Sequence, residues 1–194
     1  MSPRCPAPLA LLAALIAAGA AAPPAAADSR PASRGPYAEA SLGATGMIGP
    51  GRTYARLGPA FALRAGVDLF SWLSIGGRLE LETHEARVPP PPEGEYFQLL
   101  AAAGDLRISV PAGRFALFAD GGLGITRVST NILAKVDILD PGETYSPLLS
   151  AGGGLEYQLQ NRHYAVGLAG QWSLLPAFDA MQTVGGRAYL RYTY

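Results

Sequence analysis

The sequence predicts an all-β protein, an antiparallel up-and-down barrel of eight strands that spans a membrane. Three observations predict this fold class. Apolar and polar residues alternate along eight separate stretches, which is typical of strands with one face toward lipid and the other toward a lumen. Long connections follow the first, third, fifth and seventh stretches, and short turns follow the others. Charged residues make up only 15% of the 194 residues, which favours a lipid-facing surface over a fully water-exposed one.

The first 27 residues have the pattern of a signal peptide that precedes the barrel. Arg4 supplies a positive charge, residues 9–20 form an unbroken apolar run, and a Pro pair is followed by three alanines at 25–27. The run is short and rich in alanine for a transmembrane helix, so we expect cleavage after Ala27 rather than an uncleaved anchor. Export through this signal is the first indication of an envelope protein.

Residues 28–35 are predicted to form a short leader, and residues 36–194 the barrel domain. The single cysteine, Cys5, lies within the signal peptide, so disulfides are not expected to stabilise the mature fold. Basic and acidic residues are equal in number, 15 of each in the full chain. This balance leaves no basic field for nucleic acid, which we exclude as a partner.

The predicted strands are each long enough to cross a bilayer when tilted. The connections between them are rich in Gly and Pro, which mark turns and loops. Strand number matters because an even count lets the first and last strands pair, and closure leaves no free edge in lipid. The strands are predicted at residues 36–45, 60–70, 73–82, 95–109, 115–126, 149–159, 163–174 and 183–194.

The fourth predicted strand contains a conflict, because Phe97 and Leu99 share a face with Asp105 and Arg107. An Arg facing lipid at mid-membrane costs about 2–4 kcal/mol, whereas an apolar side chain inside the barrel costs little. We therefore predict that the charged pair points inward. The alternative is a β-bulge within 101–104 that turns the upper half of the strand over. The residues predicted to face outward are Leu100, Ala102, Gly104, Leu106 and Ile108.

Charged residues of both signs gather on the face that is predicted to point inward. Eight strands enclose an interior that side chains just fill, and buried charges need partners. We therefore predict a lumen plugged by ion pairs and hydrogen bonds, with a narrow pore as the alternative. The predicted lumen-facing network consists of Glu39, Arg64, Asp68, Arg78, Glu80, Glu82, Asp105, Arg107, Asp120, Glu156, Arg187 and Arg191.

The alternation alone also fits an inverted arrangement, in which the apolar face turns inward and the charges face water. That chain would be a soluble periplasmic barrel that binds a lipid, as lipocalin-like proteins do. The aromatic residues favour the membrane, because they lie on the apolar face near predicted strand ends, where interfacial girdles occur. These aromatics are Tyr157, Tyr164, Trp172, Tyr192 and Tyr194.

Three segments carry a resemblance to a known family: residues 68–77 (DLFSWLSIGG), residues 119–125 (ADGGLGI) and the closing residues 186–194. They resemble the small eight-stranded outer-membrane β-barrels, the group of the outer membrane protein A membrane domain and outer membrane protein X. The resemblance implies a monomer in outer-membrane lipid, with a structural role or a surface partner at its extracellular loops. It also implies a C-terminal signal for the barrel assembly machinery at Leu190, Tyr192 and Tyr194, with Tyr where Phe is commonest.

Some barrels of this family are enzymes that act on lipids through a His, a Ser and an acid. This chain offers His84, at the predicted start of a loop, and His163, beside a short turn. No serine occupies the alternate positions Ala165 and Gly167 after His163. We therefore interpret both as surface or turn histidines, and predict no enzyme, no catalytic residue and no cofactor.

Two loop segments have candidate binding chemistry. Asp137, Asp140 and Glu143 could offer oxygen ligands to Ca²⁺, but their spacing matches no EF-hand loop, so a solvated acidic loop and no metal site are predicted. Four consecutive prolines at 89–92 could dock in an aromatic groove of a partner. The simpler interpretation is that they stiffen the loop.

Overall fold

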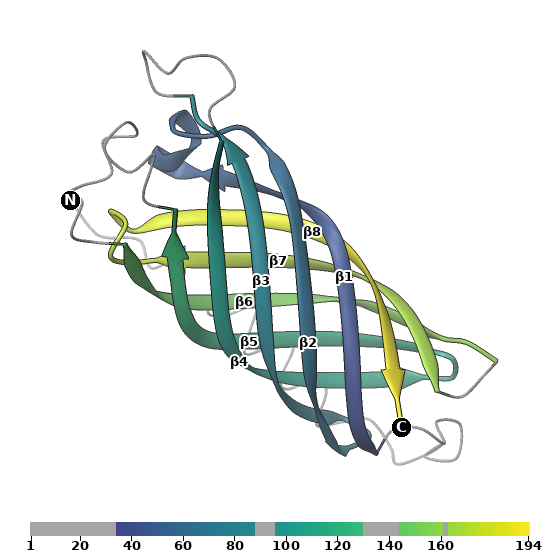
Figure 1. Ribbon diagram of the computed structural model, residues 1–194. Helices are drawn as coiled ribbons and strands as arrows, with labels where there is room; N and C mark the ends of the chain where they lie inside the picture. The colour runs from purple at the N-terminus through teal and green to yellow at the C-terminus, as the bar shows by residue number, and fades with distance from the viewer. Residues whose placement is uncertain (1–33, 88–95, 130–143, 161–162) are drawn as a thin grey trace, which may run out of the picture.

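The computed structural model describes residues 34–87, 96–129, 144–160 and 163–194, which form a closed antiparallel barrel of eight strands (Figure 1). Each strand pairs with the next, and the last pairs with the first. The strands are β1 (Gly35–Ile48), β2 (Gly58–Phe70), β3 (Leu73–Glu85), β4 (Tyr96–Ala112), β5 (Phe115–Val128), β6 (Tyr145–Gln158), β7 (Tyr164–Leu175) and β8 (Met181–Thr193), with a 3-10 helix, η2 (Gly49–Thr53), after β1.

All eight predicted strands are present, and the prediction of a closed antiparallel barrel is confirmed. Several strands run further than predicted. β6 begins at Tyr145, four residues before the predicted start, and β3 ends at Glu85, three residues past the predicted end. The turn between β4 and β5 is limited to Gly113 and Arg114, because β4 continues to Ala112, three residues past its predicted end. Pro111 is tolerated there because the pairing of β4 with β3 stops at Ile108, so no N–H donor is needed on that side.

The β3–β4 register runs without a bulge from Ile108 to Tyr96, so the bulge that would reorient half of β4 is wrong. Phe97 and Leu99 are buried inside the barrel together with Asp105 and Arg107. Phe97 and Leu99 can face inward because they lie toward the long-loop end of β4, where other buried apolar side chains surround them. Inside the barrel, therefore, an apolar zone follows a charged zone along the same strands.

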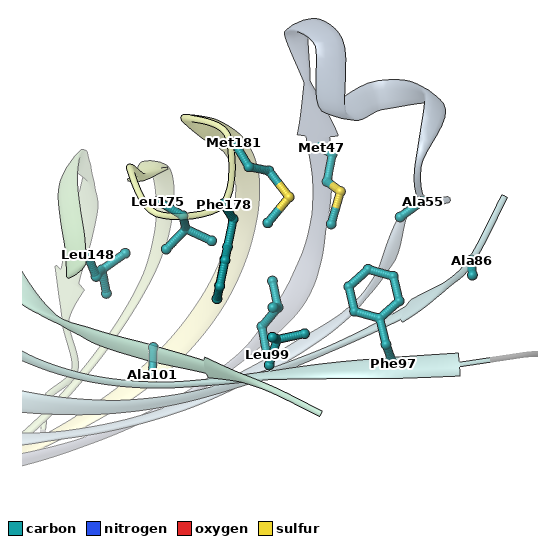
Figure 2. Packing of buried hydrophobic residues seen from close by; sticks show 11 residues of the cluster. Met47, Ala55, Ala86, Phe97, Leu99, Ala101, Leu148, Leu175, Phe178 and Met181 are labelled. Atoms are coloured by element: carbon teal, nitrogen blue, oxygen red, sulfur yellow. The ribbon is translucent and has the colours of Figure 1, made fainter. Parts of the chain in front are cut away.

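The apolar zone closes the interior at the long-loop end, and we refer to it as the apolar cluster (Figure 2). Its side chains come from six strands and from the three connections that follow β1, β3 and β7. Phe178, only 2% exposed, belongs to the β7–β8 turn, where Asp179 and Ala180 have positive φ. The cluster consists of Met47, Ala55, Ala86, Phe97, Leu99, Ala101, Val128, Leu148, Leu175, Phe178 and Met181.

The outer face of the barrel is a belt of exposed apolar residues, such as Leu42 (66% exposed), Leu123 (69%) and Leu168 (67%). The inverted, lipocalin-like arrangement is therefore wrong. Outward aromatics gather at the short-turn end, where ring contacts pair Phe70 with Trp72, Phe115 with Tyr157, and Tyr192 with both Tyr164 and Tyr194. Within the described part of the chain, no helix is long and apolar enough to cross a membrane, which does not bear on crossing by strands.

Candidate functional site: the lumen network

The twelve charged residues of the predicted network all have buried side chains inside the barrel, between 2% and 10% exposed. Strand alternation puts them there, and the register sets Glu39, Arg64 and Arg78 side by side on β1, β2 and β3. They comprise seven carboxylates and five guanidinium groups, and each lies within 4 Å of an opposite charge or of His84. The interior is therefore an ion-pair network rather than a single site.

Two arginines hold the centre of this network. Arg107 binds Glu39 with both terminal nitrogens, at 3.0 and 3.4 Å, and lies 3.6 Å from Asp120. Arg64 lies 3.1 Å from Asp120 and, through Nε, 3.1 Å from Asp105. Each guanidinium is thus shared between carboxylates from different strands. The arrangement cross-links β1, β2, β4 and β5 through the lumen.

A second group extends the network toward the apolar cluster. Arg78 donates to Gln171 and, at 2.9 Å, to the Ser150 hydroxyl, and its Nε lies 3.4 Å from Glu80. Gln171 in turn donates to Glu80 at 3.2 Å, and Arg187 binds the other oxygen of that carboxylate. The sequence-based network omitted Gln171 and Ser150 because it considered only charged residues. Their inward parity on β7 and β6 was the signal that could have found them.

A third group lies near the short-turn end. Arg191 binds Asp68, and its guanidinium carbon sits 3.8 Å from the centroid of the Tyr37 ring. Asp68 also accepts a 2.5 Å hydrogen bond from Ser74. Cation–π contacts with buried aromatic rings stabilise a guanidinium that has left water. At this end the lumen therefore contains charged side chains and aromatic rings in contact with one another.

His84 lies in the lumen, and the expectation of a surface or turn histidine is wrong. The three extra residues of β3 carry His84 inside, where it is fully buried. Its Nδ1 lies 3.1 Å from the carbonyl oxygen of Arg56, and its Nε2 lies 3.3 Å from Glu82. The ring packs on Phe97, with 5.5 Å between centroids. His84 thus connects the β1–β2 connection to both the charged network and the apolar cluster.

Both ring nitrogens of His84 face an oxygen atom, one of the Arg56 backbone carbonyl and one of the Glu82 carboxylate. With both nitrogens engaged, His84 has none to activate a nucleophile.

The cavities found inside the barrel are very small. One of about 10 Å³ lies among Glu39, Arg64 and Arg107, and one of about 20 Å³ lies at the short-turn end beside Asp68. Another of about 20 Å³ lies between Glu80 and the apolar cluster. A cavity needs roughly 10–15 Å³ by this measure to hold a single water. Each of these three spaces therefore fits about one water.

Inward glycines make room for the large lumen side chains, and this close packing is testable. A Cβ on Gly167 would lie 2.4 Å from the Tyr189 ring and 2.6 Å from the Leu155 carbonyl oxygen, whereas one on outward Gly186 would meet nothing within 4 Å. We expect Gly167→Ala to lower the free energy of unfolding by about 1–3 kcal/mol. Gly186→Ala should change it by less than about 0.5 kcal/mol. Urea unfolding in lipid vesicles measures both, and equal losses would contradict a filled lumen.

The remaining candidates lie apart from the network. His163 is exposed in the β6–β7 turn, with Nδ1 2.8 Å from the Thr193 carbonyl oxygen. Leu190 and Tyr194 face outward, 48% and 67% exposed. Asp137, Asp140, Glu143 and the prolines at 89–92 lie outside the described residues. Among the residues that are described, no group of three or more His, Cys, Asp or Glu could hold a metal ion.

Comparison with solved structures places this geometry among known folds. Neisserial surface protein A matches with a TM-score of 0.60 and 12% identity, over 82% of this chain and 97% of that one. The outer membrane protein OprG from Pseudomonas aeruginosa matches with a TM-score of 0.58 and 12% identity, over 86% and 99%. The fold is that of the small eight-stranded outer-membrane β-barrels.

A third structure has the same architecture. The attachment invasion locus protein of Yersinia pestis, Ail, was solved with the heparin analogue sucrose octasulfate. It matches with a TM-score of 0.51 and 12% identity, over 82% of this chain and 99% of that one. No protein-family model matches the sequence, and no curated protein matches it. At these identities the likeness extends to the fold, and function has to be argued from this chain's own residues.

Proposed function

We propose that this chain is a monomeric outer-membrane protein with a plugged lumen, acting as a structural or surface-interaction protein through its outer loops. It is exported by a signal peptide at residues 1–27, followed by a leader at 28–35. The single observation that carries the proposal is the division of the barrel surface. Apolar side chains face outward along all eight strands, and the charged side chains of the network face inward. Lipid is the solvent that this arrangement fits.

The filled interior supports a role other than conduction. Seven carboxylates and five guanidinium groups lie across the lumen in ion-pair contacts, and the cavities between them hold about one water each. Beyond them, the apolar cluster closes the long-loop end. A path for ions would have to break several buried ion pairs, which is costly. The activity of the chain is therefore sought at its outer loops.

Loops on a rigid scaffold are, in general, where binding residues of proteins are concentrated. Two of the solved structures with this fold carry names that refer to the cell surface and to attachment: Neisserial surface protein A and the attachment invasion locus protein. For the present chain we propose the same kind of role, a contact with a surface partner. The connections after β1, β3, β5 and β7 form the end that would face the exterior.

Cell fractionation tests the location. We expect the protein in the outer-membrane fraction, with a gel mobility that changes on boiling, as a compact barrel unfolds. Trypsin added to whole cells should cut it within the long connections. A product released by osmotic shock would contradict the proposal, because it would be a soluble periplasmic protein.

The C-terminal strand supplies a prediction about assembly. The Tyr194 N–H donates to the Pro36 carbonyl oxygen, and the Thr193 N–H donates to the His163 carbonyl oxygen, so the last residues close the barrel. We propose that the barrel assembly machinery reads Leu190, Tyr192 and Tyr194. Deleting residues 192–194 should reduce surface levels severalfold, measured by heat-modifiable protein in outer membranes. Removing residues 30–32 of the leader is the matched control. Normal levels after the C-terminal deletion would contradict the assigned signal.

The two histidines of the chain, His84 and His163, are the candidates for a general base. His84 is buried with both nitrogens engaged, and His163 contacts backbone in an exposed turn. We propose that the protein is not an enzyme. Cells that carry His163→Ala should have the same lipid profile by mass spectrometry as wild type. A changed lipid A or phospholipid composition would overturn this proposal.

A further inference from the structure

The outward face of the strands carries only two charged residues among the parts of the chain that the structure describes. They are Glu85 on β3, which is half-buried, and Arg127 on β5, which is exposed, both at the long-loop end. Glu85 is neutralised by Arg56 at 2.9 Å. Arg127 has no carboxylate among the described residues within ion-pair distance, and its recorded side-chain contact is with an aromatic ring. The exposed guanidinium of Arg127 is therefore available to an anionic partner from outside the chain.

The surroundings of Arg127 define the height of the site. Its in-register neighbours are Leu100 on β4 and Tyr145 on β6. Toward the centre of the belt, the next outward residues of β5 are Ile125 and Leu123, which are 51% and 69% exposed. The Arg127 guanidinium therefore lies at the edge of the apolar belt, two residues along β5 from the exposed Ile125. That is the level at which lipid headgroups meet hydrocarbon.

The aromatic neighbour gives the guanidinium a platform. The Arg127 guanidinium carbon lies 5.9 Å from the centroid of the Tyr145 ring. An aromatic face within about 6 Å attracts the cation and restricts its rotamers, without using its N–H donors. Those donors remain free to bind an anion bidentately, which is how arginine recognises phosphate. The geometry thus combines a positioned cation with an anionic layer at the same height.

We propose that Arg127, held by Tyr145, binds the phosphate of a membrane lipid in the leaflet at the long-loop end. The inference rests on the proposed function, since it needs the chain to span the outer membrane. Charge complementarity selects the ligand: basic residues beside apolar belts attract phosphorylated headgroups.

The test uses the full mature chain in nanodiscs of phosphatidylcholine containing about one-tenth phosphatidic acid, with lipids that stay bound counted by native mass spectrometry. We expect wild type to retain phosphatidic acid, and Arg127→Gln to retain it about tenfold less, as the loss of a charge-assisted contact implies. Tyr145→Leu should reduce retention about two- to fivefold. Arg52→Gln, which removes an exposed charge from η2 at the same end, should leave retention unchanged.

The results distinguish a lipid phosphate from a free anion as the partner of Arg127. Equal retention by Arg127→Gln and wild type would overturn the proposal. Displacement of the lipid by millimolar inorganic phosphate would overturn the assignment to a lipid, because a free anion would then suffice. A folded, heat-modifiable barrel that shows no lipid preference would sink this inference and leave the proposed function standing.

Discussion

Arg107→Leu is expected to lower the free energy of unfolding by about 3–5 kcal/mol, because it removes one partner from a buried charge cluster. The guanidinium binds Glu39 bidentately, lies 3.6 and 3.7 Å from Asp120 and Glu156, and sits 4.2 Å from the Phe118 ring centroid. No other described cation is close enough to take over all of these contacts. Urea unfolding of protein refolded into vesicles, followed by tryptophan fluorescence, measures the loss.

Two further variants separate charge from packing. Arg114→Leu removes an exposed charge from the β4–β5 turn and should change the free energy of unfolding by less than about 0.5 kcal/mol. The double variant Arg107→Leu with Glu39→Leu should recover part of the loss, because it removes a buried carboxylate along with its partner. If the double variant is as unstable as the sum of its single variants, lost packing rather than uncompensated charge explains the effect.

His84→Phe is expected to lower the free energy of unfolding by about 3 kcal/mol, although the new ring preserves the contact with Phe97. The loss arises because the buried Glu82 carboxylate then has no imidazole nitrogen beside it. The carbonyl of Arg56 also loses its side-chain contact, which loosens the β1–β2 connection at the mouth. Combining His84→Phe with Glu82→Leu should restore most of the stability. If the double variant is no more stable than His84→Phe alone, the unpaired Glu82 carboxylate is not the cause of the loss.

The strand alternation was sufficient to predict the eight strands, their antiparallel order and the closed barrel. The prediction succeeded because apolar and polar residues alternate along each strand. A shift of one residue would turn every charged side chain toward lipid. Even the conflict on β4 was resolved by the cost of charge in lipid. The bulge offered as its alternative is absent from the β3–β4 register.

The apolar cluster and the position of His84 could not be predicted in the same way. Inward residues such as Phe97 and Met181 look like lipid-facing residues by composition, and only the height within the barrel distinguishes them. The sequence also marks strand ends poorly, so three unassigned residues of β3 left His84 in a predicted loop. Phe178 reaches the core from a turn with positive φ, which no periodicity reports.

The filled lumen is the central claim, and conductance in planar lipid bilayers tests it most directly. Purified, heat-modifiable protein at varied voltage should give no discrete openings above the noise of the bilayer. Arg107→Leu, which removes a cation from the centre of the network, serves as the sensitised comparison and is expected to show small, short-lived steps. Reproducible discrete openings of the wild-type protein would contradict the account, because they would require a continuous path through the buried ion pairs and the apolar cluster.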